Sequence, residues 1–129
     1  MYLSSFTDQQ KKTFFCLAHD VVVSDGELSV GEHVMMEAMR REMNLSQDFE
    51  AHYLPLEGVE KIFDTKRSRS SVLISLMQLA YADGAFEIEE QFLILKLCSL
   101  FETTDEDLHL IDNWVRRLIA LEREANGFM

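Results

Sequence analysis

Residues 25–32 read Asp-Gly-Glu-Leu-Ser-Val-Gly-Glu, and residues 83–90 read Asp-Gly-Ala-Phe-Glu-Ile-Glu-Glu. The second stretch starts 58 positions after the first (83 − 25 = 58), and each has a Glu seven residues after its Asp. The flanking apolar residues recur at the same offset, so that Met39 corresponds to Leu97 and Met43 to Phe101. A spacing that is kept together with its flanking apolar pattern predicts one supersecondary unit used twice. Each unit is expected to be a helix, an Asp-Gly turn, a polar loop and a second helix.

The composition predicts a single helical domain. The chain has 129 residues, of which 47% are hydrophobic, enough for one domain with a substantial core. One Pro and five Gly leave few turns, which favours long helices over a many-stranded sheet. We therefore predict an all-α, single-domain bundle of about seven helices over residues 1–129, with pseudo-symmetric repeat units at about 6–53 and 64–121.

Capping signals indicate where several helices begin. Thr7 and Ser29 each stand three residues before a residue that can complete a capping box, and Thr104 precedes the last amphipathic segment. In the less regular middle, we expect a short helix from Leu45 to Tyr53 and another from Pro55 to about Phe63. The segment 92–101 is apolar nearly all round, and such a helix is expected at the centre of a bundle.

The net charge and the length of the apolar runs limit the kinds of partner that we expect for the chain. A formal net charge of −11 repels phosphate backbones, so we expect no nucleic-acid partner; cations or basic protein surfaces suit it better, and a solubilising coat is the structural alternative. The longest apolar run, Phe92 to Leu100, contains Lys96 and is too short to span a membrane. The start lacks the regions of a signal peptide, and Cys16 and Cys98 form no CxxC motif. These features predict a cytoplasmic protein with buried, reduced thiols.

The acidic loops are candidates for a divalent-cation site. Their pattern fits the second half of an EF-hand, but EF-hand positions one and three would fall on Val21 and Val23 in the first repeat, which excludes that motif. If the pseudo-symmetry brings the two loops together, their carboxylates can share one ion, and the candidate ligands are Asp25, Glu32, Asp83 and Glu90. The alternative is helix capping, because acids in the first turn complement the helix dipole.

Other chemistry has weaker support in the sequence. His33 and Glu37 stand one helical turn apart, but a zinc site needs further well-spaced ligands. The sequence has no Gly-rich phosphate loop, HExxH or nucleophile elbow, so we expect no enzymatic activity, no catalytic residue and no cofactor other than the divalent cation. A hydrolase that uses the carboxylates through a metal is a distant alternative.

The paired helix–Asp-Gly–helix units resemble the TerB-like helical domain. That family is named after a tellurite-resistance protein, and its fold also occurs at the N-terminus of a membrane-anchored J-domain co-chaperone. The residues that carry the resemblance are Ala18 to Met43 and Leu76 to Phe101, anchored by Asp25, Gly26, Glu32, Asp83, Gly84 and Glu90. The resemblance implies a stress-associated protein, with divalent-metal binding at the acidic loops and no settled catalytic activity.

Two functional hypotheses follow. In the first, the chain is a non-enzymatic, stress-associated TerB-like protein whose acidic loops bind a divalent cation or a basic partner. In the second, it is a protein–protein interaction module whose acidic loops are purely structural. Its contact surface would then be the methionines at 35, 36, 39 and 43, or a basic cluster at Lys61, Lys66, Arg67 and Arg69. Filling of the helical core is the alternative for the methionines, and a solvated turn is the alternative for the cluster.

Overall fold

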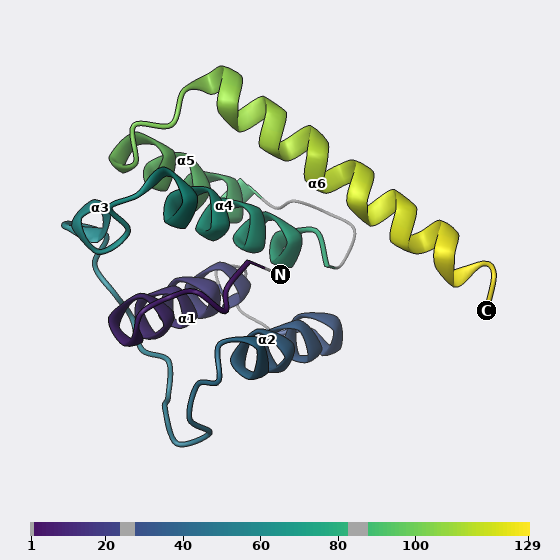
Figure 1. Ribbon diagram of the computed structural model, residues 1–129, viewed down its shortest axis with the longest axis horizontal. Helices are drawn as coiled ribbons and strands as arrows, with labels where there is room; N and C mark the ends of the chain where they lie inside the picture. Colours follow the sequence, from purple (N-terminus) through teal and green to yellow (C-terminus); the bar gives the residue numbers. More distant parts are fainter. Residues whose placement is uncertain (1, 24–27, 83–87) are drawn as a thin grey trace.

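The computed structural model describes residues 2–23, 28–82 and 88–129, and over these residues the chain forms a single all-α domain (Figure 1). Its helices are α1 (Asp8–Val23), α2 (Val30–Glu42), α3 (Val59–Ile62), α4 (Lys66–Ala80), α5 (Ile88–Leu100) and α6 (Asp105–Asn126). The described ranges thus contain six helices, against about seven expected, and no strand, which confirms the predicted all-α class. Both Asp-Gly pairs, at 25–26 and 83–84, lie outside the described residues.

Helices α1 and α4 form the centre of the domain. They pack against each other, both contact α2 and α5, and α4 also contacts α6. Their apolar side chains are inaccessible to solvent, among them Phe14, Leu17 and Ala18 of α1 and Val72, Leu76 and Leu79 of α4. Because α1 and α4 bury residues on most sides, the remaining long helices need only one apolar face each.

The expectation that the helix at 92–101 is central was wrong. Helix α5 buries Ile94, Leu97 and Cys98 against the core, but Phe92 is 61% exposed and Leu95 is 50% exposed. The central positions are already occupied by α1 and α4, so a 13-residue helix beside them can bury one face only. Apolar residues on all sides of this helix therefore did not indicate that it lies at the centre of the bundle.

The predicted helix from Leu45 to Tyr53 is also absent, because its carbonyl groups are used elsewhere. The guanidinium of Arg40 donates hydrogen bonds to the carbonyl oxygens of Ser46 and Phe49, at 2.6 and 3.0 Å. Arg40 also lies over the ring of Phe15, 4.4 Å from its centroid. These contacts hold the segment against α1 without helical hydrogen bonds. The next helix is correspondingly short: it begins after Gly58, whose φ is +84°, and not at Pro55.

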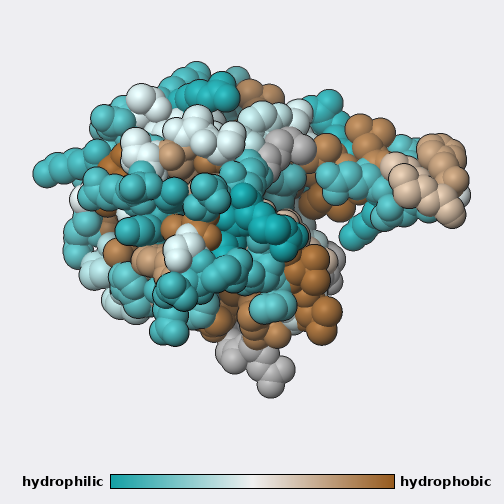
Figure 2. All heavy atoms as spheres, turned by 60° about the horizontal axis from the view of Figure 1, so that its bottom comes forward, coloured by the Kyte–Doolittle hydropathy of each residue, from teal (hydrophilic) through white to brown (hydrophobic). Residues whose placement is uncertain are grey.

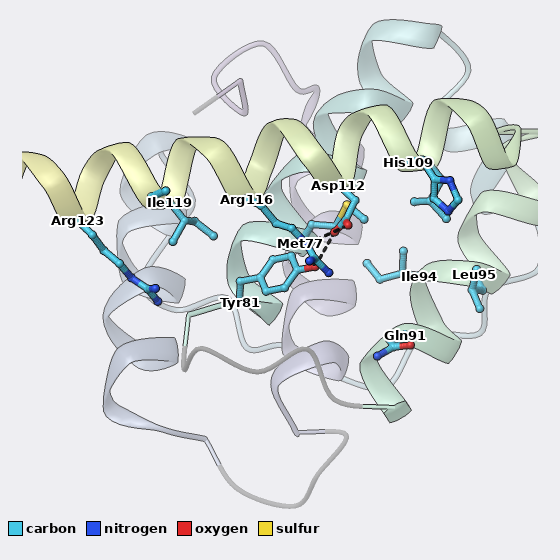
Figure 3. Close-up of a pocket in the computed structure, with 12 residues that line it drawn as sticks. Met77, Tyr81, Gln91, Ile94, Leu95, His109, Asp112, Arg116, Ile119 and Arg123 are labelled. Carbon is cyan, nitrogen blue, oxygen red and sulfur yellow. Dashed lines mark hydrogen bonds and ion pairs between the residues drawn. The ribbon is translucent and has the colours of Figure 1, made fainter.

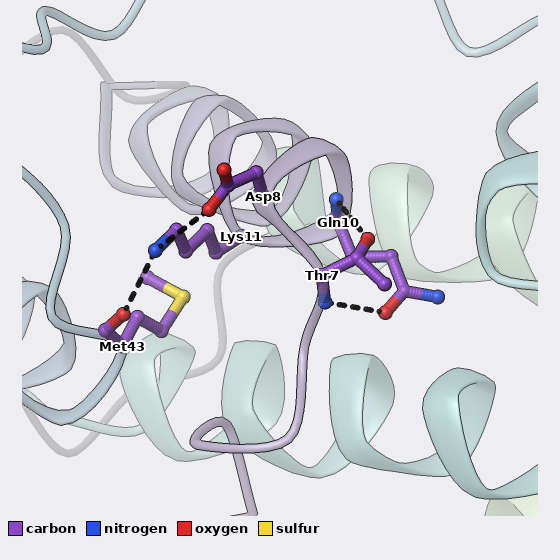
Figure 4. Close-up of polar contacts among 5 residues, drawn as sticks. All are labelled: Thr7, Asp8, Gln10, Lys11 and Met43. Carbon is purple, nitrogen blue, oxygen red and sulfur yellow. Dashed lines mark hydrogen bonds and ion pairs between the residues drawn. The ribbon is translucent and has the colours of Figure 1, made fainter.

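Local hydrogen-bonding patterns recur at the 58-residue offset. Thr7 and Gln10 exchange backbone-to-side-chain hydrogen bonds at the start of α1 (Figure 4), and Thr65 and Ser68 do the same at the start of α4. Both are capping boxes, which satisfy two backbone donors that the first helical turn leaves unpaired.

The ends of α2 and α5 match in the same way. Asn44 and Glu102 have left-handed backbone, with φ of 53° and 57°. The following amides donate back to Arg40 O and Cys98 O, both at 2.9 Å, as expected for a Schellman ending. A cation from a central helix also reaches each end: Lys11 Nζ lies 3.4 Å from Met43 O (Figure 4), and Arg69 Nη1 lies 3.2 Å from Phe101 O. The two-fold relation between complete repeat units stays a prediction, to which we return below.

The methionine stripe does not form an open surface, and one member of the basic cluster, Arg69, is held inside the fold. Met36, Met39 and Met43 are between 4 and 7% exposed, so they fill the core. Arg69 is committed inside the fold, since it also donates to the carbonyl oxygens of Phe63 at 2.6 Å and Glu60 at 2.8 Å. The other members of the basic cluster, Lys61, Lys66 and Arg67, are exposed, so a docking role for the cluster stays a prediction.

The Schellman endings give a stability prediction. Glu102 has a side chain in a left-handed backbone conformation, which costs roughly 1 kcal/mol for an L-residue and little for glycine. Glu102→Gly should therefore raise the free energy of unfolding by about 0.5–1 kcal/mol, and Asn44→Gly should raise it less, because Asn tolerates this conformation. Urea denaturation measures both. As a control, Glu122→Gly within α6 should lower stability, and a loss of stability in Glu102→Gly would contradict the assignment.

Candidate functional site

An open apolar groove lies between the underside of α6 and the helices α4 and α5 (Figure 3). Its volume is about 610 Å³. Half of the twelve lining residues are apolar, and they come from all three helices: Met77, Ile94, Leu95, Leu108, Ile119 and Ala120. The polar lining consists of Tyr81, Gln91, His109, Asp112, Arg116 and Arg123. A concave apolar surface with a few polar groups is the usual form of a ligand-binding site.

The amphipathic pattern of α6 puts its polar groups over the groove. His109, Asp112, Arg116 and Arg123 are separated by three, four and seven residues, which places them on one side of a helix. The helix begins at Thr104, whose hydroxyl oxygen accepts a hydrogen bond from the amide of Asp107 at 3.1 Å. This polar side of α6 therefore faces the groove, while neighbouring apolar residues anchor the helix on the core.

A hydrogen-bonded triad connects α4 to α6 inside the groove (Figure 3). The Tyr81 hydroxyl donates to Asp112 Oδ1 at 2.6 Å, and Arg116 Nε donates to the Tyr81 oxygen at 2.9 Å. Arg116 Nε also lies 3.1 Å from Asp112 Oδ2. Burial raises the pKa of Tyr81, and its hydrogen bond to the Asp112 carboxylate raises it further. The phenol is therefore a neutral donor at physiological pH, and the charge of Asp112 is compensated by its two partners.

A smaller cavity of about 270 Å³ continues the groove towards α2. It shares Tyr81, Ile119 and Arg123 with the larger one and adds Gly31 and Met35 of α2. Together the two cavities follow the underside of α6 from α5 to α2. The sequence analysis did not find this groove, because its walls come from four helices whose relative positions no local pattern encodes.

The predicted acidic site is only partly within the described residues. Asp25 and Asp83 lie outside them. Glu32 closes the predicted capping box: its Oε1 accepts from the Ser29 amide at 3.1 Å, and Ser29 Oγ accepts from the Glu32 amide at 3.0 Å. Glu32 and Glu90, 58 positions apart, are both buried, at 5 and 3% exposure. Within the described ranges, no group of three or more His, Cys, Asp or Glu side chains is arranged to hold a metal ion.

The fold brings together a Cys–His pair that the sequence did not indicate. Cys16 Sγ of α1 lies 3.7 Å from Nδ1 of His52, which belongs to the extended segment after α2. Burial raises the pKa of the Cys16 thiol; a hydrogen bond with the backbone of His52 opposes this, and the nearby Asp20 carboxylate raises the pKa further. Burial likewise raises the pKa of Cys98 to about 11. Both cysteines are free, as predicted, and both are protonated at neutral pH, the opposite of an activated nucleophile.

The geometry defines a class of protein: an all-α domain with an apolar groove beneath its last helix and, in the part of the chain that is described, no catalytic arrangement. Residues 56–113 match the family model described as Tellurite resistance protein TerB, so this part of the chain is a TerB domain. The matched region contains α3, α4 and α5 and the first part of α6, and thus Tyr81 and Asp112 of the groove.

Comparison with curated proteins and with solved structures gave no match for the chain. Among the helices that the structure describes, none combines the length and the apolar character needed to cross a membrane.

The triad predicts a change in the titration of Tyr81. In Asp112→Asn the phenol no longer donates to a carboxylate, so the pKa of Tyr81 should fall towards its ordinary value of 10.0 but remain raised by burial. Because the pKa of Tyr81 is higher in the folded protein than in the unfolded chain, the neutral phenol stabilises the folded state. This contribution to the free energy of unfolding is complete below pH 10 and is lost as the pH rises through the pKa of Tyr81 in the folded protein. This alkaline loss should be smaller in the variant.

Phenolate absorbance measures the titration, with Tyr2→Phe/Tyr53→Phe as the background that isolates Tyr81. The same background carrying Asp112→Asn provides the comparison. Identical titration curves for the two proteins would contradict the role of Asp112.

Proposed function

We propose that the chain is a non-enzymatic binding module whose groove beneath α6 receives a polypeptide segment that carries an apolar side chain next to a carboxylate. The observation that supports this most strongly is the apolar groove of about 610 Å³ with its bridging triad. The volume lies within the range of specific ligand sites, roughly 300–1,000 Å³. The proposal follows the interaction-module hypothesis, with a contact surface other than those expected from the sequence.

The apolar part of the ligand is supported by the groove lining. Leu95 is 50% exposed on the α5 wall, and Ile119 is half-buried on the α6 side. A ligand side chain between them would remove apolar area from water on both sides at once. The Tyr81–Asp112–Arg116 triad crosses the groove and fixes the distance between α4 and α6, so the site is formed before a ligand arrives.

The position of Arg123 supports a carboxylate on the proposed ligand. Its side chain makes no hydrogen bond or ion pair with the residues that the structure describes, although it lines both cavities (Figure 3). A guanidinium binds a carboxylate through two parallel hydrogen bonds, which are stronger than those between neutral groups. The chain has a net charge of −11, so the positive charge of Arg123 is a local exception, and it favours an anionic group at one end of the groove.

A second candidate function is binding of a divalent cation by Asp25, Glu32, Asp83 and Glu90. The observation in its favour is that Glu32 and Glu90 are buried at positions 58 residues apart, because buried carboxylates require compensation by hydrogen bonds or positive charge. The capping box of Glu32 supplies part of that compensation. We also propose, on the TerB match alone, that the chain acts in a stress-related setting such as tellurite resistance.

The cation hypothesis depends on the two-fold repeat, which we propose for residues 7–45 and 65–103. The capping boxes, the Schellman endings and the cation-to-carbonyl contacts at the same offset support it. In addition, α2 and α5 begin and end at equivalent positions (30 + 58 = 88; 42 + 58 = 100). Under this proposal, Glu32 and Glu90 occupy equivalent positions in the two units (32 + 58 = 90).

The groove can be tested with a small probe of the same chemistry. The dye 8-anilinonaphthalene-1-sulfonate combines apolar rings with an anionic group. We expect one binding site in the wild type, and about tenfold weaker binding in Leu95→Glu and Arg123→Glu, because each removes one half of the recognition. Fluorescence titration measures the affinity. The matched control is Val34→Glu, which introduces the same side chain at a 59% exposed residue outside the groove.

A labelled peptide rich in Leu and Glu then tests the polypeptide ligand. It should displace the dye, and the same peptide with Lys at each Glu position should not. Equal dye affinity in all three Glu variants would reject the groove as the site. Displacement by both peptides would retain the groove and reject the carboxylate.

Calorimetry tests the cation hypothesis. With metal bound only to the folded state, a hundredfold excess over Kd stabilises the fold by roughly 2.7 kcal/mol. The wild type, freed of metal by a chelator, should therefore melt at a higher temperature with one of Ca²⁺, Mg²⁺, Mn²⁺ or Zn²⁺, and Asp25→Asn/Asp83→Asn should lose that increase. Asn keeps the capping ability and removes the charge. No heat and no shift with any of the four ions would leave the acidic loops with a structural role only.

A further inference from the structure

Helix α6 carries a second apolar surface on the flank opposite the groove. Its residues are spaced alternately by three and four positions, the a and d pattern of a helix that packs along another helix. We call these residues the α6 seam: Ile111, Trp114, Leu118, Leu121, Ala125 and Phe128. Phe128 follows the end of α6 but continues its geometry, since Gly127 has right-handed helical backbone and the Phe128 amide donates to Ala125 O at 3.0 Å.

The domain itself covers only the first part of the α6 seam. Ile111 and Trp114 pack against the core, and the ring of Tyr2 lies 6.3 Å from that of Trp114. Further along, Leu121 is 60% exposed and Phe128 is 89% exposed. Helix α6 has 22 residues, against 13 in α5, and its C-terminal end projects beyond the other helices (Figure 1). Apolar residues gather on this projecting end (Figure 2).

We propose that the α6 seam pairs with the α6 seam of a second copy of this chain, the two helices running antiparallel about a two-fold axis. In this register Leu118 faces Leu121 of the second copy, Trp114 faces Ala125, and Ile111 faces Phe128. Each contact occurs twice, as in every isologous interface. The largest side chain of the α6 seam is thus opposite the smallest, which favours close packing of the two helices.

Charge complementarity favours the second copy and the antiparallel direction. Arg117 and Glu124 flank the α6 seam, both are exposed, and neither has a partner among the residues that the structure describes. In an antiparallel pair, flanking positions of the same type face each other, so Arg117 of each copy lies beside Glu124 of the other. In a parallel pair, Arg117 would instead lie beside Glu122. The antiparallel direction also sets the two domains at opposite ends of the helix pair.

The two copies would meet along the α6 seam, whose later part their own domains leave uncovered and whose first residues, Ile111 and Trp114, their own domains cover in part. A formal charge of −11 on each chain opposes association at long range, so the contact must depend on the apolar α6 seam and on the two Arg117–Glu124 pairs. Both can be removed separately by substitution of exposed residues, which leaves the fold of the monomer intact.

Sedimentation velocity over a range of concentrations tests the pairing. The wild type should form a dimer, and Leu121→Glu should raise the dimer dissociation constant by more than about tenfold, because it places a charge in the middle of the α6 seam. Leu95→Glu, the same substitution at an exposed leucine in the groove, should leave the dimer unchanged. Circular dichroism melts verify that both variants are folded. A wild type that is monomeric at every concentration, or a Leu121→Glu protein that dimerises like the wild type, would overturn the proposal.

Substitutions that reverse the charges of Arg117 and Glu124 test whether the two α6 helices run antiparallel. Arg117→Glu and Glu124→Arg should each weaken the dimer by about tenfold or more, since each turns two attractive pairs into two repulsive ones. A mixture of these two variants should dimerise again, because both charge contacts of the mixed pair are attractive. At one contact the introduced glutamate of the first variant lies beside the introduced arginine of the second, and the other contact is the native pair. Glu122→Arg should have little effect. Failure of the mixture to dimerise would overturn the antiparallel arrangement, and so would a strong effect of Glu122→Arg.

Discussion

The packing of α1 against α4 is the contact on which the rest of this structure depends. Both helices bury residues on most of their circumference, and α2, α5 and α6 each add one apolar face to this central pair. Because each outer helix is covered on one side only, its other side stays open. The groove beneath α6, the exposed side chains of α5 and the free flank of α6 all result from this arrangement.

The C-terminal ends of α2 and α5 also depend on the central pair, because cationic side chains of α1 and α4 contact them. The last carbonyl groups of a helix have no partner within it and carry a partial negative charge. Lys11 of α1 reaches the end of α2 at Met43, and Arg69 of α4 reaches the end of α5 at Phe101. Arg40, from α2 itself, binds the carbonyl groups of the segment that follows. Arg40 and Arg69 thus act as internal cross-links, so Arg69 is not available to a partner, whereas Lys61, Lys66 and Arg67 of the basic cluster stay exposed.

Much of the fold could be predicted from the sequence, because it depends on local chemistry. The capping boxes at Thr7 and Ser29 and the burial of the methionines follow from spacings of three and four residues along one helix. Two expectations were wrong because contacts outside the three- and four-residue helical spacing decided them. Arg40 prevents a helix after Leu45 by taking its carbonyl groups, and the central pair displaces α5 from the middle of the bundle. The same distinction applies to the candidate sites. The Ser29–Glu32 cap could be predicted because its residues are three positions apart. The triad could not, because Tyr81 is 31 to 35 positions from Asp112 and Arg116 and meets them only after the helices have packed.

The two proposed binding surfaces of α6 are compatible because they lie on opposite flanks of one helix. Arg116 and Arg123 point into the groove (Figure 3), while Leu121 and Phe128 belong to the α6 seam on the opposite flank. A second copy on the α6 seam would leave the groove open in both chains, so the dimer would present two ligand sites. It would also hold the projecting half of α6, which carries Arg123, in a fixed position. Ordering of that segment before the ligand arrives reduces the entropy lost on binding, so dimer formation should favour occupancy of the groove.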